Sequence, residues 1–325
     1  MSSLVFLKLL AIFVVVAIGW VVGKLKWLGV VGDTSDPART LANAAYYIFV
    51  PALLFRTTAR IDFKTMPWGT LVAIFVPMLA MQLVVYAWQR RGLARGTLPA
   101  AGPSVRAISA VFGNSVQVGI PRAAALFGDG GLALHLAIVS LHALVLLSLA
   151  TTLVELDIAR LSHADTHLAA TLLNTARNTI VHPVVLPVLV GMMWNVLGLP
   201  LPAVADEILQ TLGQAVVPLC LVLIGMSLAY YGVQGAAKVA VGLSVLKLLV
   251  LPSLVLTVAH WGFHLNGVPL AVVVMMAALP AGSNALMFAQ RYQTLEGEPT
   301  AAVVFSTLGF VITAPLWLAL LATFN

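Results

Sequence analysis

Long apolar runs, separated by short polar segments, dominate the hydrophobic pattern of this chain. An α-helix needs about 20 apolar residues to cross the ~30 Å hydrocarbon core of a bilayer. Ten runs approach or exceed that length: Leu4–Gly23, Ala38–Thr58, Pro67–Gln89, Ser104–Phe127, Gly131–Val154, Thr179–Leu197, Ala203–Tyr230, Gly235–Trp261, Val268–Arg291 and Thr300–Thr323. The pattern therefore predicts an all-α polytopic membrane protein with ten transmembrane helices.

The composition agrees with this interpretation. Hydrophobic residues make up 61% of the 325 residues and charged residues only 9%, with a mean hydropathy of +1.03. Soluble domains carry about 25% charged residues, so this chain has too little polar surface to cover a soluble fold. That excludes a cytosolic enzyme and a nucleic-acid binder, although the pI is near 9.7. Cys220 is the single cysteine, which excludes an internal disulfide and a cysteine metal site.

Lysine and arginine are distributed unequally between alternate loops. With the N-terminus outside, the inner loops hold eleven of them: Lys24, Lys26, Arg39, Arg90, Arg91, Arg95, Arg106, Arg160, Arg177, Lys238 and Arg291. The outer side holds five: Lys8, Arg56, Arg60, Lys64 and Arg122. Because cytoplasmic loops carry the excess of positive charge, we expect a multi-pass protein of the cell (inner) membrane with both termini extracytoplasmic. Lys24 and Lys26, directly after the first run, also predict an uncleaved helix rather than a signal peptide.

The two halves of the chain align at an offset of about 170 residues. Three pairs carry the alignment: Val50–Leu54 with Val217–Leu221, Gly113-Asn114 with Ser283-Asn284, and Gly19 with Gly191. Five helices per half mean that the second half enters the membrane from the opposite side. The predicted organisation is therefore a first five-helix repeat over 1–154, a cytoplasmic linker over 155–177, and a second, inverted repeat over 178–325. Inverted repeats are the architecture of many secondary transporters, which bind substrate near the midplane between the halves.

Helix-breaking residues interrupt the fourth and ninth runs at matching places. They are Gly113, Gly119 and Pro121 in the fourth run, and Pro280 and Gly282 in the ninth. Broken backbone inside a bilayer is tolerated only where protein or a watery cavity satisfies the freed N–H and C=O groups. Glycine and proline are also common in ordinary membrane helices. Two breaks at repeat-related positions, each beside an asparagine, favour a functional crossover of helices 4 and 9 at the midplane.

The polar side chains at the two breaks suit an anion. Amides, hydroxyls and the N–H groups of a helix start all donate hydrogen bonds without a full charge. The predicted substrate-binding residues are Asn114, Ser115, Gln117, Ser283 and Asn284. No aspartate or glutamate lies at the centre of a span, which disfavours an acidic proton relay. We expect no metal site and no cofactor, and we expect movement driven by the anion gradient and the membrane potential.

Several other polar residues have alternative interpretations. Arg122 either snorkels to the membrane interface or draws anions towards the site. Lys247 serves either an anion or scaffold role, or is a buried hydrogen-bonded cation. His135 and His142 share one helical face, and His142 is either hydrogen-bonded between helices or coupled to protonation. Helix packing or cavity lining explains the remaining candidates in the second span of each half: Asn43, Tyr46, Pro51 and Pro218.

Four stretches together resemble the auxin efflux carrier family, which includes plant PIN-type carriers and bacterial transporters of malonate and related acids. The stretches are Leu279–Tyr292 with Phe305–Leu308 and Thr313–Trp317, Tyr46–Phe55, Phe112–Gly128 and Val217–Ala229. The resemblance implies a five-plus-five inverted fold related to bile-acid sodium symporters, with broken, crossing helices 4 and 9. It also implies export of small organic anions, with Asn114 and Asn284 facing the substrate carboxylate. The chain departs from the plant pattern in having only a short linker between its halves.

The predicted function is a secondary transporter of small organic anions, mono- or dicarboxylates, that works by alternating access. The alternative is a sodium- or proton-coupled organic-anion symporter of the bile-acid type. An intramembrane enzyme is disfavoured because no catalytic set of side chains lies in the spans. The expected partners are a small organic anion and the lipid bilayer, with no nucleic acid; a homodimer is left open.

A topology reporter tests the predicted orientation. A reporter that works only outside the cytoplasm is expected to be active when fused after Asn325, because the cation bias places that end outside. Activity at the same position of a reporter that works only in the cytoplasm would reverse the predicted orientation.

Overall fold

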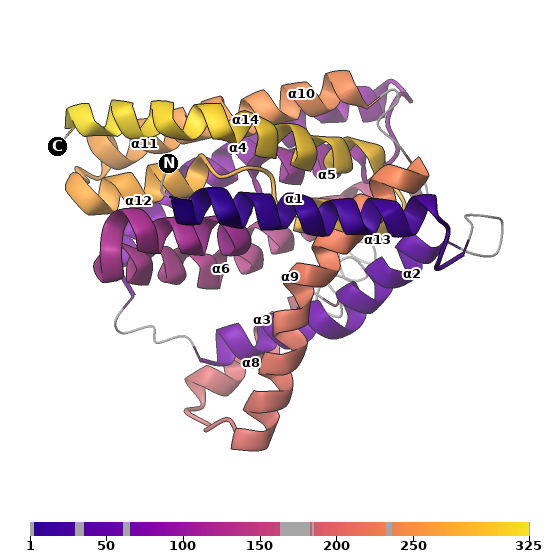
Figure 1. Cartoon of the computed structure of the whole chain (residues 1–325), viewed down its shortest axis with the longest axis horizontal. Helices are drawn as coiled ribbons and strands as arrows, with labels where there is room; N and C mark the ends of the chain where they lie inside the picture. The colour runs from indigo at the N-terminus through magenta and orange to yellow at the C-terminus, as the bar shows by residue number, and fades with distance from the viewer. Residues whose placement is uncertain are drawn as a thin grey trace.

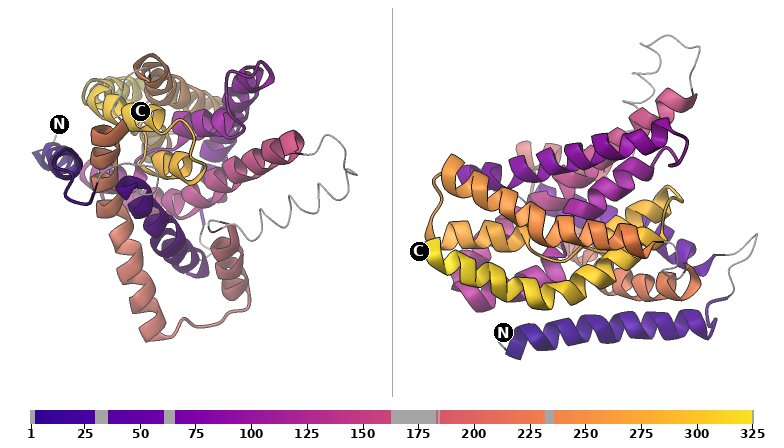
Figure 2. Two further views of the ribbon diagram at one scale, coloured as in Figure 1. Left: turned by 90° about the vertical axis from the view of Figure 1, so that its right-hand side faces the viewer. Right: turned by 90° about the horizontal axis from the view of Figure 1, so that it is seen from above.

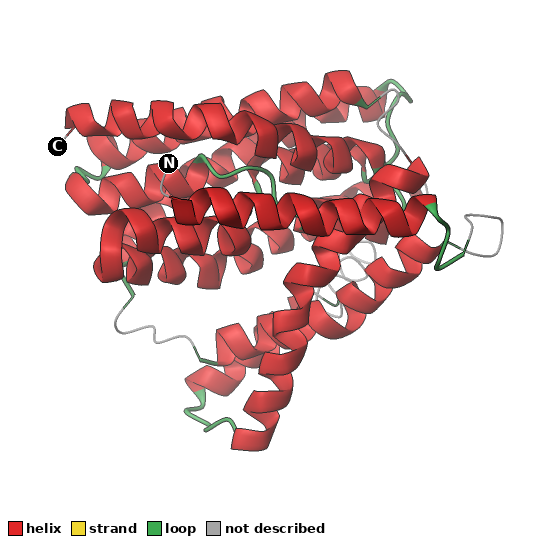
Figure 3. Cartoon of the chain, viewed as in Figure 1, coloured by secondary structure: helices red, strands yellow, loops and turns green. Residues whose placement is uncertain are grey.

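The computed structural model describes residues 3–29, 36–60, 66–162, 183, 185–231 and 236–324, and every regular element among them is helical (Figures 1 and 3). The α-helices are α1 (Ser3–Lys24), α2 (Pro37–Ala44), α3 (Val50–Ala59), α4 (Trp68–Ala94), α5 (Gly102–Val111), α6 (Ile120–Ser162), α8 (Val185–Val196), α9 (Ala203–Tyr231), α10 (Ala237–Val245), α11 (Leu251–Thr257), α12 (Gly267–Ala277), α13 (Asn284–Arg291) and α14 (Gly297–Leu321). The predicted all-helical class is confirmed for the described residues.

Among the residues that the structure describes, six helical segments are long and apolar enough to cross a membrane. They are Pro37–Ala59, Trp68–Ala94, Arg122–Leu161, Ala203–Tyr230, Ala237–Gly262 and Gly297–Phe324. Shorter apolar helices are Val14–Lys24, Leu186–Val196 and Gly267–Ala277. The helix composition is that of a multi-pass membrane protein, as the apolar runs predicted.

Wide π-helical turns precede three prolines in these helices. The turns η1 (Ala45–Phe49), η2 (Ser115–Gly119) and η3 (Leu246–Val250) lead into helices whose second residue is Pro51, Pro121 or Pro252. Proline has no N–H, and its ring clashes with the carbonyl of the preceding turn. A wider turn makes room for the ring, so the chain continues as a helix. A further π-turn, η4 (Val258–Gly262), follows α11, and a short 3₁₀ turn, η5 (Ala322–Phe324), follows α14.

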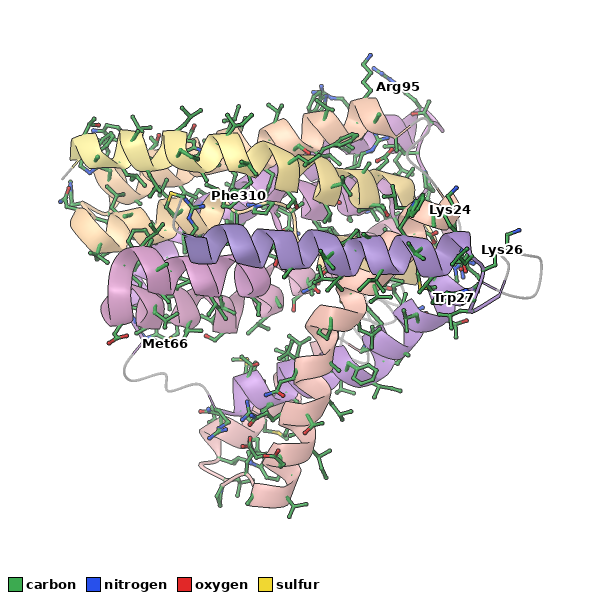
Figure 4. The ribbon with its side chains drawn as sticks, in the orientation of Figure 1. Lys24, Lys26, Trp27, Met66, Arg95 and Phe310 are labelled. Atoms are coloured by element: carbon green, nitrogen blue, oxygen red, sulfur yellow. The ribbon has the colours of Figure 1, made fainter. Side chains whose placement is uncertain are left out.

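The helices form two groups. In the first group α1 packs along α9, and α3 packs against α8 and α9. The second group contains α4, α5, α6 and α10 to α14, with α4 on α5 and α10 on α14. Figures 1 and 2 show α8 and the adjoining parts of α3 and α9 projecting away from the second group. The side chains of Lys24, Lys26 and Arg95 lie towards one end of the molecule in Figure 4, opposite the start of α1 and the end of α14.

Glycines bring helix backbones together in the first group. A Cβ atom on Gly19 of α1 would lie 2.1 Å from the carbonyl oxygen of Val222 in α9. A Cβ atom on Gly225 would lie 2.0 Å from the carbonyl oxygen of Val16. Gly191 of α8 meets α3 in the same way, since its Cβ would lie 2.7 Å from the Phe55 carbonyl oxygen. Close approach of backbones through small residues is how membrane helices gain packing without a hydrophobic driving force.

The polar stretch predicted as a linker from residue 155 begins as helix instead. Helix α6 continues to Ser162, while residues 163–177 of the predicted linker lie outside the described residues. Neighbouring side chains satisfy the polar groups of this helical part: Tyr86 donates to Asp157 at 2.8 Å, and Tyr292 donates to Glu155 at 3.2 Å. Burial raises the pKa of the Tyr292 hydroxyl, so it stays protonated and able to donate. The first residues of the predicted linker, up to Ser162, are therefore helical.

Replacing Gly225 by alanine tests the close contact of α1 with α9. The added methyl group must displace a backbone carbonyl, and overpacking of this kind costs about 1–3 kcal/mol. We expect the melting temperature of purified Gly225→Ala protein to fall by about 2 °C or more. The matched control is Gly242→Ala, a helical glycine of α10 with open space around it, which should not lower the melting temperature. A Gly225→Ala protein that melts like the parent would contradict this packing.

Candidate functional site

Two helices break where the sequence places glycine, proline and asparagine together. Helix α5 ends at Val111, and Phe112 continues in an extended conformation before η2 begins at Ser115. Helix α12 ends at Ala277, and α13 begins at Asn284. Both breaks leave backbone N–H and C=O groups without partners in their own helices. Another part of the protein must therefore supply their hydrogen-bond partners.

The two broken segments supply these partners to each other. The backbone N–H of Asn114 donates to the carbonyl oxygen of Pro280 at 2.8 Å, and that of Gly282 donates to Phe112 at 2.9 Å. Gly113 lies opposite Ala281 in an antiparallel bridge. A Cβ atom on Gly282 would lie 2.9 Å from the carbonyl oxygen of Gly113, so the segments can pair this closely only where a side chain is missing.

Side chains from neighbouring helices hold both segments in place. The Nε2 atom of His135 lies 2.9 Å from the carbonyl oxygen of Ser115, and the N–H of Ala281 donates to the hydroxyl of Ser306 at 2.9 Å. Gly119 packs closely against the His135 ring. A Cβ atom on Gly119 would lie 2.6 Å from the His135 Nε2 atom. The crossover is thus fixed from both halves of the chain.

Lys247 lies at the C-terminal end of a broken helix. Its side chain is fully buried, and its ammonium donates to the carbonyl oxygen of Ala277, the last residue of α12. A Cβ atom on Gly113 would lie 3.4 Å from the Lys247 Nζ, so the amine also adjoins the first broken segment. A helix C-terminus carries about half a negative charge. Of the two interpretations, the geometry is that of a buried hydrogen-bonded cation.

A cavity of about 110 Å³ lies beside the crossover, between the two groups of helices. Its lining comprises Leu53, Leu54, Thr57, Phe112, Gly113, Asn114, Ser115, Val116, Val139, Ser140, His142, Ala143, Val216, Gly282, Ser283 and Asn284. Four of the five predicted substrate-binding residues are among them. A water molecule needs about 10–15 Å³ of such space, so the cavity has room for a small organic anion.

Polar groups without protein partners face this cavity. Asn114 is buried, and its Oδ1 accepts no hydrogen bond within the described part of the chain. Both ring nitrogens of His142 are also buried without a hydrogen bond, and its ring centroid lies 4.4 Å from that of Phe112. His142 thus has no hydrogen-bond partner among the residues that the structure describes. Buried polar groups are normally paired, so these groups mark a place for a bound ligand or ordered water.

Asn114 also borders a second, mostly apolar cavity of about 320 Å³. Its lining comprises Val16, Ala17, Trp20, Asn114, Leu221, Ile224, Leu228, Val303, Val304 and Thr307. Asn114 therefore lies where the two cavities meet.

Sequence reasoning missed the far wall of the first cavity. Leu53, Leu54 and Thr57 of α3 and Val216 of α9 form this wall opposite the crossover. Thr57 is polar within an apolar run, yet its hydroxyl donates to the carbonyl of Leu53 in its own helix at 2.7 Å. Such hydroxyls are common in membrane helices, so the sequence carried no signal that separates Thr57 from a packing residue.

Other predicted residues lie away from the cavity. Arg122 is buried, with its guanidinium 4.7 Å from the centre of the Phe310 ring, so it neither snorkels nor faces the cavity. Asn43 is exposed and Tyr46 is buried under Arg291, 5.8 Å from its ring centre; neither lines the cavity. The cation–π contact of Arg122 could not be predicted from the sequence, because its partner Phe310 comes from a distant helix.

The remaining predicted residues either lie within helices or have side chains outside the described residues. Pro51 is half-buried at the start of α3, and Pro218 is exposed inside α9. The side chains of Gln117 and Pro121 lie outside the described residues. Over the described residues, no group of three His, Cys, Asp or Glu side chains could hold a metal ion.

The sequence matches the family model described as Membrane transport protein over residues 4–318. The chain belongs to this family, the auxin efflux carrier family. The resemblance inferred from its motifs is thereby confirmed. The carrier is a membrane transport protein, and its family is one of transporters rather than enzymes.

Two relatives show how far the similarity extends. An uncharacterized transporter of Methanothermobacter thermautotrophicus is 25% identical to the carrier over 316 residues, which cover 95% of each chain. The uncharacterized transporter YfdV of Escherichia coli K12 is 30% identical over 136 residues, 42% of the carrier and 43% of that protein. The first match extends over both broken segments, so the whole carrier is similar to a transporter.

Proposed function

We propose that the carrier is a secondary transporter of small organic anions, mono- or dicarboxylates, with the carboxylate bound at the crossover. We further propose ten transmembrane helices in two inverted repeats, 1–154 and 178–325, with the connecting residues of 155–177 in the cytoplasm and both termini outside an inner membrane. The common end of Lys24, Lys26 and Arg95 supports this orientation. The packing of repeat-related Gly19 and Gly191, each onto a helix of the opposite half, supports the repeat.

One observation carries the proposed substrate class: an asparagine amide from each half lines the same small cavity. Asn114 and Asn284 make no side-chain hydrogen bond to any residue that the structure describes. Each amide has two N–H donors, and the orientation of an amide follows its partners. A carboxylate has two oxygen atoms to receive them, so one substrate group can join both halves of the chain.

Helix starts add positive potential at the same place. Helix α13 begins at Asn284, and η2, which continues into α6, begins at Ser115; both residues line the cavity. A helix N-terminus carries roughly half a positive charge and presents free N–H groups. An anion is therefore favoured over a neutral or cationic substrate without an arginine or lysine in the cavity.

The arrangement of the two helix groups fits alternating access. The cavity lies between them, and two contacts join α2 and the η1 turn that follows it to the second group. Arg39 pairs with Glu296 at 3.2 Å, and the guanidinium of Arg291 lies 5.8 Å from the centre of the Tyr46 ring. In our proposal these contacts close the cytoplasmic side, and they must separate before an anion can enter the cavity from there.

The membrane potential supplies the driving force in this proposal. With the inside negative, expelling one negative charge gains about 2.3 kcal/mol per 100 mV. Export of an anion therefore needs no coupled cation. The alternative, a sodium- or proton-coupled symporter of the bile-acid type, would need a cation site that changes with the transport cycle.

Asparagine variants test the proposed site. Hydrogen bonds to a charged group contribute about 1.5–3 kcal/mol, so Asn114→Ala and Asn284→Ala should each weaken carboxylate binding roughly ten- to a hundredfold. Asn→Asp should weaken it further, because the new carboxylate repels the substrate. The measurement is binding of a panel of mono- and dicarboxylates to purified protein.

The matched control is Asn43→Ala, which removes an exposed asparagine outside the cavity and should bind like the parent. The melting temperature and elution profile of each variant must match those of the parent. A loss of binding then cannot be caused by a loss of the folded structure. Parental binding and transport in both crossover variants would place the substrate site elsewhere.

Ion dependence separates the proposal from its alternative. In reconstituted vesicles, anion transport should continue without a sodium or proton gradient and should increase when the membrane potential drives the anion outwards. The measurement is flux of a labelled carboxylate at set potassium-diffusion potentials. A strict requirement for sodium would favour the bile-acid-type symporter instead.

A further inference from the structure

A basic hollow of about 520 Å³ lies between the C-terminal ends of α4 and α6, apart from the crossover cavity. Its lining comprises Ala87, Arg90, Arg91, Leu93, Ala94, Asp157, Arg160 and Leu161. Three arginines and a single carboxylate thus line the hollow. None of these residues lines the cavity at the crossover, so the transport site does not account for them.

A buried carboxylate organises two of the arginines. The Asp157 side chain is fully buried and accepts a hydrogen bond from Tyr86 at 2.8 Å. The Nε of Arg90 lies 3.2 Å from its Oδ1, and the Nη1 of Arg160 lies 3.5 Å from the same oxygen. Two flexible side chains are therefore held beside the hollow before any ligand arrives, which lowers the entropy cost of binding. Arginines that only set membrane orientation need no such buried partner.

Positive charge remains after these pairs form. Each guanidinium has five N–H donors, and Asp157 occupies only one side of Arg90 and Arg160. Arg91 forms no ion pair with any residue that the structure describes. The hollow can therefore donate several charge-assisted hydrogen bonds to an anionic group, and arginine suits phosphate because its planar fork matches the phosphate oxygens.

The surroundings of the hollow are apolar and exposed. Val84 and Trp88, two turns and one turn before Arg91 on α4, are 67% and 57% exposed, and Leu161 at the end of α6 is 62% exposed. Tryptophan is enriched where a membrane helix meets the headgroup layer. The hollow thus adjoins the lipid-facing surface of α4, where a phosphate group and an acyl chain can be bound together.

We propose that this hollow binds the phosphate of an anionic phospholipid, with Arg90, Arg91 and Arg160 as donors and an acyl chain along Val84 and Trp88. Basic pockets between membrane helices are a known way to hold anionic headgroups. The exposed apolar residues favour a lipid over a soluble phosphate, which would gain nothing from them. In the proposed orientation the lipid belongs to the cytoplasmic leaflet.

Lipid titration of the full-length protein tests this site. Purified carrier in detergent is titrated with phosphatidylglycerol or with phosphatidylcholine of the same acyl chains, and bound lipid is counted by native mass spectrometry. We expect phosphatidylglycerol to bind at least about tenfold more tightly. Arg91→Gln should lose about tenfold or more of that affinity, since it removes a charged donor worth about 1.5–3 kcal/mol.

Arg95→Gln is the matched control, because Arg95 is an exposed arginine that caps the same end of α4 and does not line the hollow. It should bind phosphatidylglycerol like the parent. Equal loss in Arg91→Gln and Arg95→Gln would overturn the site in favour of diffuse surface charge. Equal binding of the two lipids by the parent would also overturn it.

Asp157→Asn distinguishes a built site from simple charge. The substitution makes the hollow more positive, so charge alone predicts tighter binding of phosphatidylglycerol, whereas loss of the organised arginines predicts weaker binding. Weaker binding supports the proposal and tighter binding contradicts it; if the variant does not fold, the Arg91 and Arg95 pair decides. Displacement of phosphatidylglycerol by millimolar glycerol phosphate would identify a soluble-phosphate site instead.

Discussion

The exchange of backbone hydrogen bonds between two interrupted helices is the constraint on which the rest of this structure depends. A bilayer offers no water to the freed groups, so the N–H groups of Asn114 and Gly282 must find carbonyl oxygens inside the protein. They find them in Pro280 and Phe112, each on the other segment. The pairing brings the two halves of the chain together at a point that neither half could stabilise alone.

The electrostatics of the crossover follow from the direction of its helices. Two helix starts adjoin the cavity, at Ser115 and Asn284. The C-terminal end of α12 meets the buried ammonium of Lys247 instead. Partial positive charge therefore faces the cavity, while the Lys247 amine donates to a carbonyl at the opposite, partly negative end. In the proposed function, these neutral donors hold an anion without a tight ion pair that would slow its release.

The basic hollow between α4 and α6 contains charged donors, in contrast to the neutral donors of the crossover cavity. There, full guanidinium charges gather around Asp157 at the surface of the molecule. The free-energy cost of a charged donor is small in the headgroup layer, because water and counterions solvate it there. The cost is large at membrane depth. In our proposals the carrier has two anion sites, one with amides and helix starts at the crossover and one with arginines at the basic hollow.

The apolar runs, the interruptions and the asparagine at each of them were predictable from sequence, because run length and helix breakers act locally. The two segments that meet at the crossover are also the ones that the predicted alignment of the two halves pairs. The sequence did not predict which side chains line the cavity and which pack elsewhere. His142 lines the cavity, Tyr46 and Arg122 do not, and Tyr86 and Tyr292 donate hydrogen bonds to the acidic residues after Val154. Those partners come from distant helices, so only the tertiary structure decides them.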